Sequence, residues 1–145
     1  MATVYVLNGP NLNLLGSRET AVYGATTLAD VEKLCMEAGK RNGHSVVFRQ
    51  SNHEGELVDW LQEANSKAAG VVINPGAYTH TSIALHDAIR AISVPVIEVH
   101  LSNIFAREEF RHHSYVSPVA RGVLCGFGPK GYELAIDGLA NALKA

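Results

Sequence analysis

The sequence predicts a doubly wound α/β fold, in which a five-stranded parallel sheet carries helices on both faces. Short apolar segments alternate with segments of helical periodicity along the chain. The apolar segments are continuous runs of Val, Ile and Leu, as expected of strands that are covered on both faces. The chain has 145 residues, the usual length of one domain, and no repeat or linker divides it. We therefore expect a single domain over residues 1–145.

The expected elements alternate in order. The strands are Thr3–Leu7, Ser45–Gln50, Gly70–Asn74, Val94–Val99 and Gly122–Cys125. The first helix begins near Thr27, and the second carries Leu57, Leu61 and Ala64 on one face. The third spans Thr79–Ile92, and the last spans Gly131–Leu143. Thr27 and Asp30 have the spacing of a capping box, and either Thr79 or Thr81 can cap the third helix. Five strands joined by helical crossovers correspond to the flavodoxin-like member of the doubly wound class.

Composition and charge exclude several classes of protein. Hydrophobic residues make up 47% of the chain and charged residues 18%, which excludes a disordered chain. The formal net charge is −2, so there is no basic surplus for binding nucleic acid, and none is expected as a partner. No apolar stretch approaches the ~18 residues of a membrane span, and Asn8, Pro10 and Asn11 interrupt the first one. With Cys35 and Cys125 as isolated thiols in apolar segments, we expect a cytoplasmic protein with no membrane partner.

Two features that resemble cofactor or metal sites are better explained by local structure. Gly126–Gly131 matches G-x-G-x-x-G, but only 14 residues follow it. A dinucleotide site needs a later strand with an acidic residue about 20 positions on, so we expect only a tight turn here. His80 and His86 are six residues apart and His112-His113 are adjacent, and neither spacing is typical of metal ligands. We expect neither a cofactor nor a metal.

The candidate site follows from the topology. Ligands of doubly wound folds bind beyond the carboxyl ends of the strands. That rule selects the three segments Asn8–Tyr23, Asn74–Thr81 and Glu98–Arg111, which hold most of the unusual polar residues of the chain. The clustering predicts a functional site at this end of the sheet.

The segment after the first strand offers Asn11, Arg18 and Tyr23. Asn11 ends a turn-forming sequence at the mouth of the strand. Loops longer than about 12–15 residues are usually functional or disordered, so this segment is a candidate lid that carries Arg18 and Tyr23. The residues alone leave a second interpretation open, in which Arg18 is a solvated charge and Tyr23 a packing anchor.

The end of the third strand offers Asn74, Gly76 and His80. Asn74 places an amide at the strand tip, and Gly76 lets the backbone approach a ligand closely. His80 lies at the mouth of the following helix, where a ligand-binding role and a capping or surface role are equally compatible with the sequence.

The end of the fourth strand carries charged residues. Alternation places Glu98 and His100 on the same side of the strand, where a carboxylate would orient an imidazole for general acid catalysis. A carboxylate in an apolar strand is costly, which favours a functional pair over a purely structural one. Arg107 and Arg111 are four residues apart. On one helical turn they would share a face and could bind a carboxylate or hydroxyl groups, unless they belong to an ordinary charged surface helix.

Together these motifs resemble those of type II 3-dehydroquinate dehydratases. The resemblance rests on Leu7-Asn8-Gly9-Pro10-Asn11, Arg18-Glu19, Tyr23-Gly24, Gln50-Ser51-Asn52, Asn74-Pro75-Gly76-Ala77, Thr79-His80-Thr81-Ser82, Glu98-Val99-His100, Arg107-Glu108-Glu109-Phe110-Arg111, His113-Ser114 and Gly131-Tyr132. It implies a hydro-lyase of the shikimate and quinate pathways that converts 3-dehydroquinate into 3-dehydroshikimate without metal, cofactor or Schiff base. The three strand-end segments contain no lysine, which agrees with the absence of an imine step.

The resemblance also implies a role for each catalytic residue. Tyr23 would be the base that removes a proton beside the ketone, and Arg18 would favour its phenolate form. A water held by Asn11 would donate to the enolate oxygen. His100 would protonate the departing hydroxyl, with Glu98 as its orienting partner.

The substrate-binding residues are implied in the same way. The substrate carboxylate would bind at Asn74 and at Ser102, together with the backbone amide of Leu101. His80 and Arg111 would hold the ring hydroxyls and so fix the reacting proton near the base.

The remaining implications concern the lid and the assembly. Arg107 would add positive potential or hold the lid, and Asp87 resembles the residue that reaches a neighbouring subunit's site. The family assembles as a homo-dodecamer, a tetramer of trimers. Three other classes stay open on the residues alone: a flavodoxin-like binding module, a structural oligomer and a different lyase on the same scaffold. The binding module would leave Glu98, His100 and Arg111 unexplained, and the structural oligomer would not need a lid that carries a tyrosine and an arginine.

Overall fold

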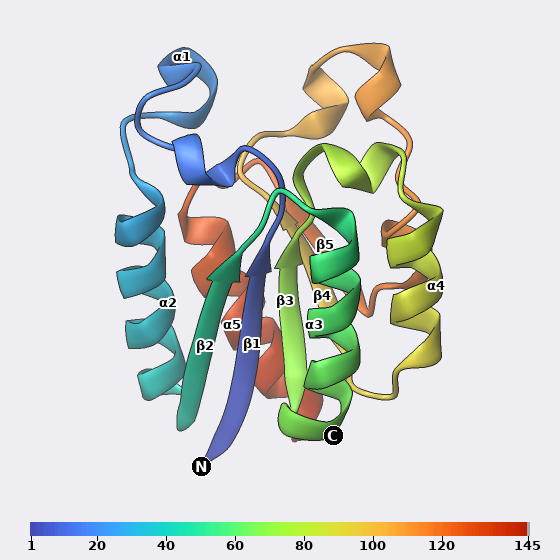
Figure 1. The fold of residues 1–145 in the computed structure, drawn as a ribbon. Helices are drawn as coiled ribbons and strands as arrows, with labels where there is room; N and C mark the ends of the chain where they lie inside the picture. Colours follow the sequence, from blue (N-terminus) through green and yellow to red (C-terminus); the bar gives the residue numbers. More distant parts are fainter. Residues whose placement is uncertain (145) are drawn as a thin grey trace.

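Five parallel strands form one sheet in the computed structural model, which describes residues 1–144 (Figure 1). The strands are β1 Ala2–Asn8, β2 His44–Gln50, β3 Gly70–Asn74, β4 Val96–His100 and β5 Gly122–Cys125. Their order across the sheet is β2-β1-β3-β4-β5, so the chain reverses its direction of winding between β1 and β3. This confirms the flavodoxin-like prediction, and it places the topological switch point beyond the carboxyl ends of β1 and β3.

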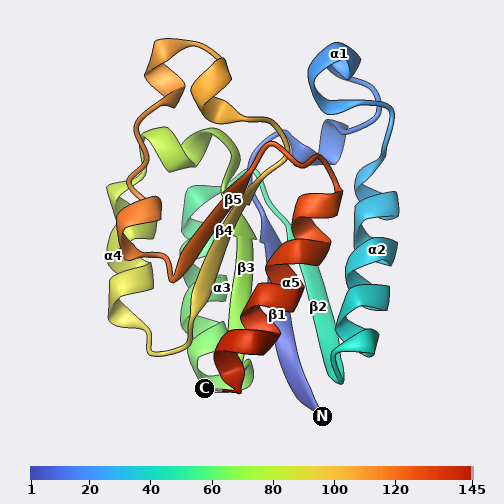
Figure 2. The same cartoon turned by 180° about the vertical axis from the view of Figure 1, so that it is seen from behind.

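Helices cover both faces of the sheet, as Figures 1 and 2 show from opposite sides. The longer helices are α2 Leu28–Arg41, α3 Glu54–Lys67, α4 Ile83–Ala91 and α5 Lys130–Leu143, and a short helix α1 spans Thr20–Tyr23. Helices α2 and α5 pack on one face, and α3 and α4 pack on the other. Within β1, Val4 and Val6 face the first pair while Tyr5 and Leu7 face the second. Burial on both faces explains why the strands are continuous apolar runs.

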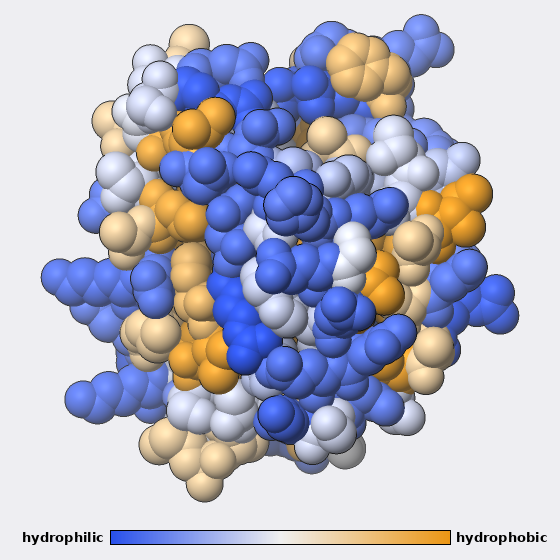
Figure 3. Space-filling model, viewed as in Figure 1, coloured by the Kyte–Doolittle hydropathy of each residue, from blue (hydrophilic) through white to orange (hydrophobic). Residues whose placement is uncertain are grey.

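The outer surface of α3 is mostly polar. The helix buries Leu57, Leu61 and Ala64, the face expected from the sequence, and Val58 and Trp60 pack partly buried beside them. Figure 3 shows mostly hydrophilic side chains across the middle of this face of the molecule, where α3 lies.

The capping box of α2 is also present, because Asp30 N donates to Thr27 Oγ1 at 3.2 Å and Thr27 N donates to Asp30 Oδ2 at 3.0 Å.

The third long helix begins later than the sequence predicts. Gly76–His80 form a 3₁₀ turn, and α4 starts at Ile83 with Ser82 as its cap, since Leu85 N donates to Ser82 Oγ at 2.9 Å. Thr79 and Thr81 are therefore not the cap. The Thr79 hydroxyl instead donates to the buried carboxylate of Glu98, an interaction between distant segments that helix-start rules do not consider.

Strand β4 is also displaced, covering Val96–His100 in place of Val94–Val99. Its ladder with β3 starts at the pair Val71 and Val96. Val94 is apolar because it packs against the α3–α4 side of the core before the strand begins. The segment Gly126–Gly131 is the expected tight turn, with φ values of 93° at Gly126 and 60° at Gly128.

The loops at the carboxyl ends of the strands lie together at the top of Figure 1. Gly9 N, just after β1, donates to the Asn74 carbonyl oxygen at 2.8 Å. A Cβ atom at Gly9 would lie 2.4 Å from the Pro75 carbonyl oxygen, so the two loops approach as closely as glycine allows. None of the helices within residues 1–144 is long and apolar enough to cross a membrane.

We expect Gly9→Ala to lower the free energy of unfolding by about 1–3 kcal/mol, because its methyl group meets a backbone carbonyl that cannot turn aside. The matched control is Gly55→Ala on α3, where a Cβ meets no atom within 4 Å and where alanine favours the helix. Urea denaturation of both variants checks this. Equal stabilities for the two variants would contradict the close approach of the two loops.

Candidate active site

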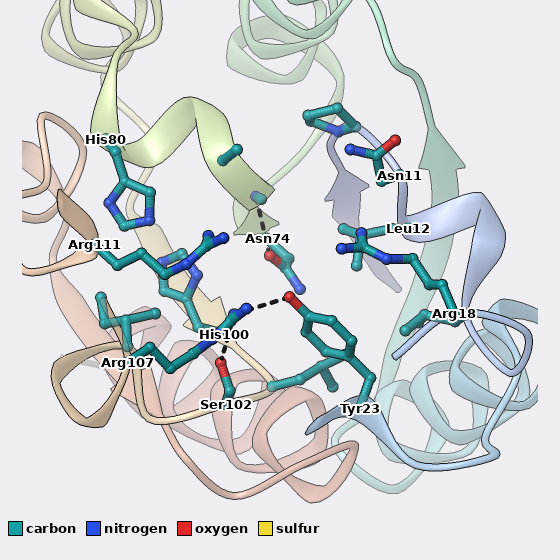
Figure 4. A pocket seen from close by; sticks show the side chains of 16 residues that line it. Asn11, Leu12, Arg18, Tyr23, Asn74, His80, His100, Ser102, Arg107 and Arg111 are labelled. Atoms are coloured by element: carbon teal, nitrogen blue, oxygen red, sulfur yellow. Dashed lines mark hydrogen bonds between the residues drawn. The ribbon is translucent and has the colours of Figure 1, made fainter. Parts of the chain in front are cut away.

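A cavity of about 130 Å³ opens at the carboxyl ends of β1, β3 and β4 (Figure 4). Its wall comes from the three segments that the topology rule selected. All the expected site residues line it except two: Glu98, which lies behind His100, and Asp87, which is exposed on α4. The structure therefore brings together Asn11, Arg18, Tyr23, Asn74, Gly76, His80, His100, Leu101, Ser102, Arg107 and Arg111.

Glu98 and His100 form a buried pair at the end of β4. Glu98 is fully buried, His100 is 5% exposed, and His100 Nε2 lies 2.5 Å from Glu98 Oε2. An ionised carboxylate only accepts hydrogen bonds, so Nε2 carries the proton of this bond. The other ring nitrogen, Nδ1, is then available to the cavity that His100 lines.

Three hydroxyl groups complete the surroundings of Glu98. Thr79 and Ser117 donate to its two carboxylate oxygens, and Ser114 donates to Oε2 at 3.4 Å. Burial by itself would raise the pKa of Glu98, but the hydrogen bond and charge of His100 and the hydroxyls of Ser117 and Thr79 together hold the pKa below its ordinary value. Glu98 is thus an anion at neutral pH, able to orient His100 and to stabilise its protonated form.

His80 faces the cavity as a neutral ring. Its Nδ1 donates to the His113 carbonyl oxygen at 2.8 Å, which leaves Nε2 as an acceptor. Partial burial, more than any other cause, lowers the pKa of His80, and the charges of His100 and Arg111 lower it further. A neutral imidazole with a free acceptor nitrogen can hold a ligand hydroxyl.

Tyr23 reaches over the cavity from α1 and packs partly buried against the α2–α5 side of the core. Its hydroxyl oxygen accepts a hydrogen bond from Arg107 Nη1 at 2.8 Å (Figure 4). The guanidinium carbons of Arg18 and Arg107 lie 5.0 and 5.3 Å from the centre of its ring. The candidate lid is therefore in place, but the arginine that contacts the phenol oxygen is Arg107, whereas Arg18 faces the ring and pairs with Glu19.

The two arginines after β4 do not share a helical face. Arg107 follows the 3₁₀ turn Ile104–Ala106, and Arg111 lies in a separate turn, Glu109–Arg111. The extended backbone at Arg107, with φ −106° and ψ −161°, breaks the helical spacing between them. Both nevertheless line the cavity, because the two short turns fold over its rim. Arg111 Nε also donates to both carboxylate oxygens of Glu108 at 3.2 Å.

The exposed Asn11 and the buried Asn74 both contribute amide groups to the cavity wall. Asn11 has a left-handed backbone with φ 69°, which asparagine tolerates, and its backbone N donates to Asn52 Oδ1 at 3.0 Å. Asn74 is 3% exposed, and its Oδ1 accepts from Gly76 N at 3.1 Å. Gly76 has φ 58°, a conformation that favours glycine.

Several residues that organise the site were not predicted from the sequence. Thr79, Ser114 and Ser117 bind Glu98, and the Tyr132 hydroxyl contacts both Asn74 and Asn8. Ser and Thr are common in loops, so nothing marked these hydroxyls as partners of a buried carboxylate. Tyr132 lies on the apolar face of α5, where a tyrosine is indistinguishable from an ordinary core residue.

The charge of the cavity wall suits an anionic, hydroxylated small molecule. Among the described residues that line it there are three arginines and no carboxylate. Within residues 1–144, no three His, Cys, Asp or Glu side chains come close enough together to hold a metal ion. The groups available for chemistry are a histidine paired with a buried carboxylate, a tyrosine flanked by arginines, and neutral polar side chains such as Asn74 and Ser102.

Comparisons with known proteins agree with this site. Residues 2–140 match the family model of "Dehydroquinase class II". The chain is 68% identical over 138 residues to 3-dehydroquinate dehydratase 1 of Agrobacterium fabrum, covering 95% of each protein. It is 65% identical over 144 residues to 3-dehydroquinate dehydratase of Mesorhizobium japonicum, covering 99% of this chain and all of the relative. The crystal structure of type II dehydroquinase from Propionibacterium acnes is similar, with a TM-score of 0.93, 47% identity and 97% of each chain covered. The chain belongs to the class II dehydroquinase family.

Proposed function

We propose that this chain catalyses the dehydration of 3-dehydroquinate to 3-dehydroshikimate, a step of the shikimate pathway, by proton abstraction at Tyr23 and general acid catalysis at His100. The observation that carries the proposal is one cavity lined by both a tyrosine, hydrogen-bonded by Arg107, and a histidine paired with a buried Glu98. An elimination of water needs a base and an acid in the same site, and membership of the family supplies the substrate.

The substrate is held through its carboxylate and its ring hydroxyls. The Asn74 side chain, the Ser102 hydroxyl and the backbone N–H of Leu101 bind the carboxylate at the floor of the cavity. His80 Nε2 and the Arg111 guanidinium bind the hydroxyls. Fixing the ring at several points holds the reacting carbon near the base, so that the reaction is effectively unimolecular.

Tyr23 removes the proton from the carbon beside the ketone. A phenol is mostly protonated at neutral pH, so the base has to be activated. The Arg107 guanidinium donates directly to the phenol oxygen, and the Arg18 guanidinium lies over the ring. Arg107 therefore makes the direct contact with the proposed base that the sequence interpretation assigned to Arg18.

Loss of the proton leaves negative charge on the ketone oxygen as an enolate. A water held by the Asn11 side chain donates a hydrogen bond to that oxygen. The left-handed backbone of Asn11 and the hydrogen bond from its backbone N to Asn52 fix the position of this residue before the reaction starts.

His100 then protonates the departing hydroxyl from Nδ1, while Glu98 accepts the hydrogen bond from Nε2 throughout. Collapse of the enolate expels water and forms the conjugated enone. Because Glu98 is ionised and receives hydrogen bonds from three hydroxyls, it stabilises the imidazolium without taking its proton.

The finer proposals concern assembly. The exposed position of Asp87 on α4, outside the cavity of its own chain, supports a role in a neighbouring subunit's site within a trimer. The homo-dodecamer of four trimers stays a prediction, to be checked by light scattering.

The reaction is tested by ultraviolet absorbance of the enone after 3-dehydroquinate is mixed with exhaustively chelated protein. Silence from folded protein would overturn the proposed function.

Tyr23→Phe removes the base and leaves the carboxylate and hydroxyl sites intact. We expect turnover to fall by about 10²-fold or more, while substrate binding measured by calorimetry is retained. Tyr115→Phe is the control, since Tyr115 does not line the cavity. Near-normal turnover of Tyr23→Phe would contradict the assignment of the base.

His100→Ala separates the two proton transfers. We expect elimination to slow by about 10²-fold or more, because the leaving group departs unprotonated. Exchange of the proton beside the ketone, followed by mass spectrometry of substrate recovered from D₂O, should persist. If exchange and elimination fall together, His100 does not act at the second step.

Glu98→Gln tests the ionised state of the buried carboxyl. The folded pKa of Glu98 lies below the ordinary value of 4.5, so its charge contributes stability that is fully present above about pH 4.5 and is lost as the pH falls through the folded pKa. We expect wild type to be more stable than Glu98→Gln at pH 7, and the difference to shrink below pH 4.5. Urea denaturation across this range measures it. A pH-independent difference would show that the pKa of Glu98 is the same in the folded and unfolded protein, and would contradict a lowered folded pKa.

A further inference from the structure

Behind the floor of the cavity, a tyrosine hydroxyl lies between two asparagine side chains. Tyr132 is the first apolar residue of α5 on the sheet side, and its side chain is fully buried. Asn74 Nδ2 donates to the Tyr132 hydroxyl at 2.9 Å, and the hydroxyl donates to Asn8 Oδ1 at 2.7 Å. Asn8 and Asn74 are paired across β1 and β3, at the last position of each strand.

The donors and acceptors of this chain of hydrogen bonds allow one arrangement. Asn8 Nδ2 donates to the Arg49 carbonyl oxygen at 3.0 Å, so Asn8 must offer its oxygen to Tyr132. The single hydroxyl proton of Tyr132 is used by Asn8, and the hydroxyl oxygen can only accept from Asn74. At its other end, Asn74 Oδ1 accepts from Gly76 N at 3.1 Å. If the Asn74 amide were flipped, its Nδ2 group would face Gly76 N, and two donors would oppose each other.

We infer that Tyr132 is a positioning residue for substrate binding, which fixes the Asn74 amide so that its second Nδ2 proton, and not its oxygen, is presented to the substrate carboxylate. The inference rests on the proposed function and deepens it. Tyr132 does not line the cavity and touches no substrate atom, so it acts only through Asn74. Asn74 does line the cavity, and its oxygen and one of its two Nδ2 protons are already engaged.

The consequence is selectivity for an anion. An N–H group that cannot turn away favours a carboxylate, whereas a freely rotating amide could equally present its oxygen to a neutral carboxamide or ester. Burial raises the pKa of Tyr132 above its ordinary value, so the hydroxyl keeps its proton across the working range of the enzyme. The hydrogen-bond pattern is therefore the same throughout that range.

Tyr132→Phe tests the inference by removing only the hydroxyl. We expect KM for 3-dehydroquinate to rise about tenfold while kcat stays within about threefold, because binding of the carboxylate is the same in the ground state and the transition state. Tyr5→Phe is the matched control, since it removes a tyrosine hydroxyl bonded to Glu63 on the other face of the sheet, and it should leave both constants unchanged. An unchanged KM in Tyr132→Phe overturns the inference.

A double mutant separates positioning from general structural support. If Tyr132 acts through Asn74, the KM of the double mutant Tyr132→Phe/Asn74→Ala should be less than about twofold higher than the KM of Asn74→Ala alone. Multiplicative effects would mean that Tyr132 acts on the whole fold and would overturn the inference. If Tyr132→Phe does not fold, Asn8→Ala gives the same test, because it frees the Tyr132 proton to turn towards Asn74. It should also raise KM about tenfold, and an unchanged KM in this variant overturns the inference.

Binding of 3-dehydroshikimate, measured by calorimetry, distinguishes failure of the inference from failure of the proposed function. Suppose that wild type binds 3-dehydroshikimate about tenfold more tightly than Tyr132→Phe does but does not turn over 3-dehydroquinate. The inference then holds, and the proposed reaction is overturned. Turnover by wild type with equal affinity in both proteins would do the reverse. Wild type that neither binds nor reacts would overturn both.

Discussion

The buried charge of Glu98 is the constraint on which the arrangement of the active site depends. An ionised carboxylate with no exposed surface is stable only if its oxygens receive hydrogen bonds, and here they come from the 3₁₀ turn after β3, from β4 and from the loop before β5. Thr79, His100 and Ser117 are thereby drawn to one point. Satisfying the charge fixes the ring of His100, and it also fixes the turn that carries His80. The positions of the proposed acid, His100, and of the cavity wall around His80 are thus consequences of one desolvated anion.

A second polar cluster supports the other side of the floor. Asn8, Asn74 and Tyr132 link the ends of β1 and β3 to α5 through side-chain hydrogen bonds among buried groups. These two clusters lie at the ends of neighbouring strands, where the apolar core gives way to the cavity. Each consists of groups that would be costly to leave unpaired, so each has a single well-defined arrangement. Both clusters therefore anchor the cavity to the ends of the strands.

How much could be predicted from the sequence depended on whether the signal was local. The five strands, the capping box of Thr27 and the proximity of Glu98 to His100 follow from local patterns and spacing, and the structure agrees with them apart from the bounds of β4. The expected cap of α4 was wrong because Thr79 is recruited by Glu98, which is 19 residues away in the chain. The role of Tyr132 could not be predicted either, because its partners lie on two other elements. Roles that depend on tertiary hydrogen bonds have no periodicity by which to find them.

The proposed base, Tyr23, differs from the proposed acid, His100, in how it is positioned. Tyr23 ends a four-residue helix that lies between Glu19, with φ 41°, and Gly24, with φ 76°, so its own element offers little rigidity. Its place is set from outside, by packing against the core and by the hydrogen bond from Arg107 on the loop after β4. That bond joins the segment that carries Tyr23 to the loop that carries Arg107 and Arg111. The Arg107 guanidinium therefore holds the phenol oxygen over the cavity. The proposed base thus owes its position to a tertiary contact, whereas the proposed acid owes its position to its own strand and to Glu98.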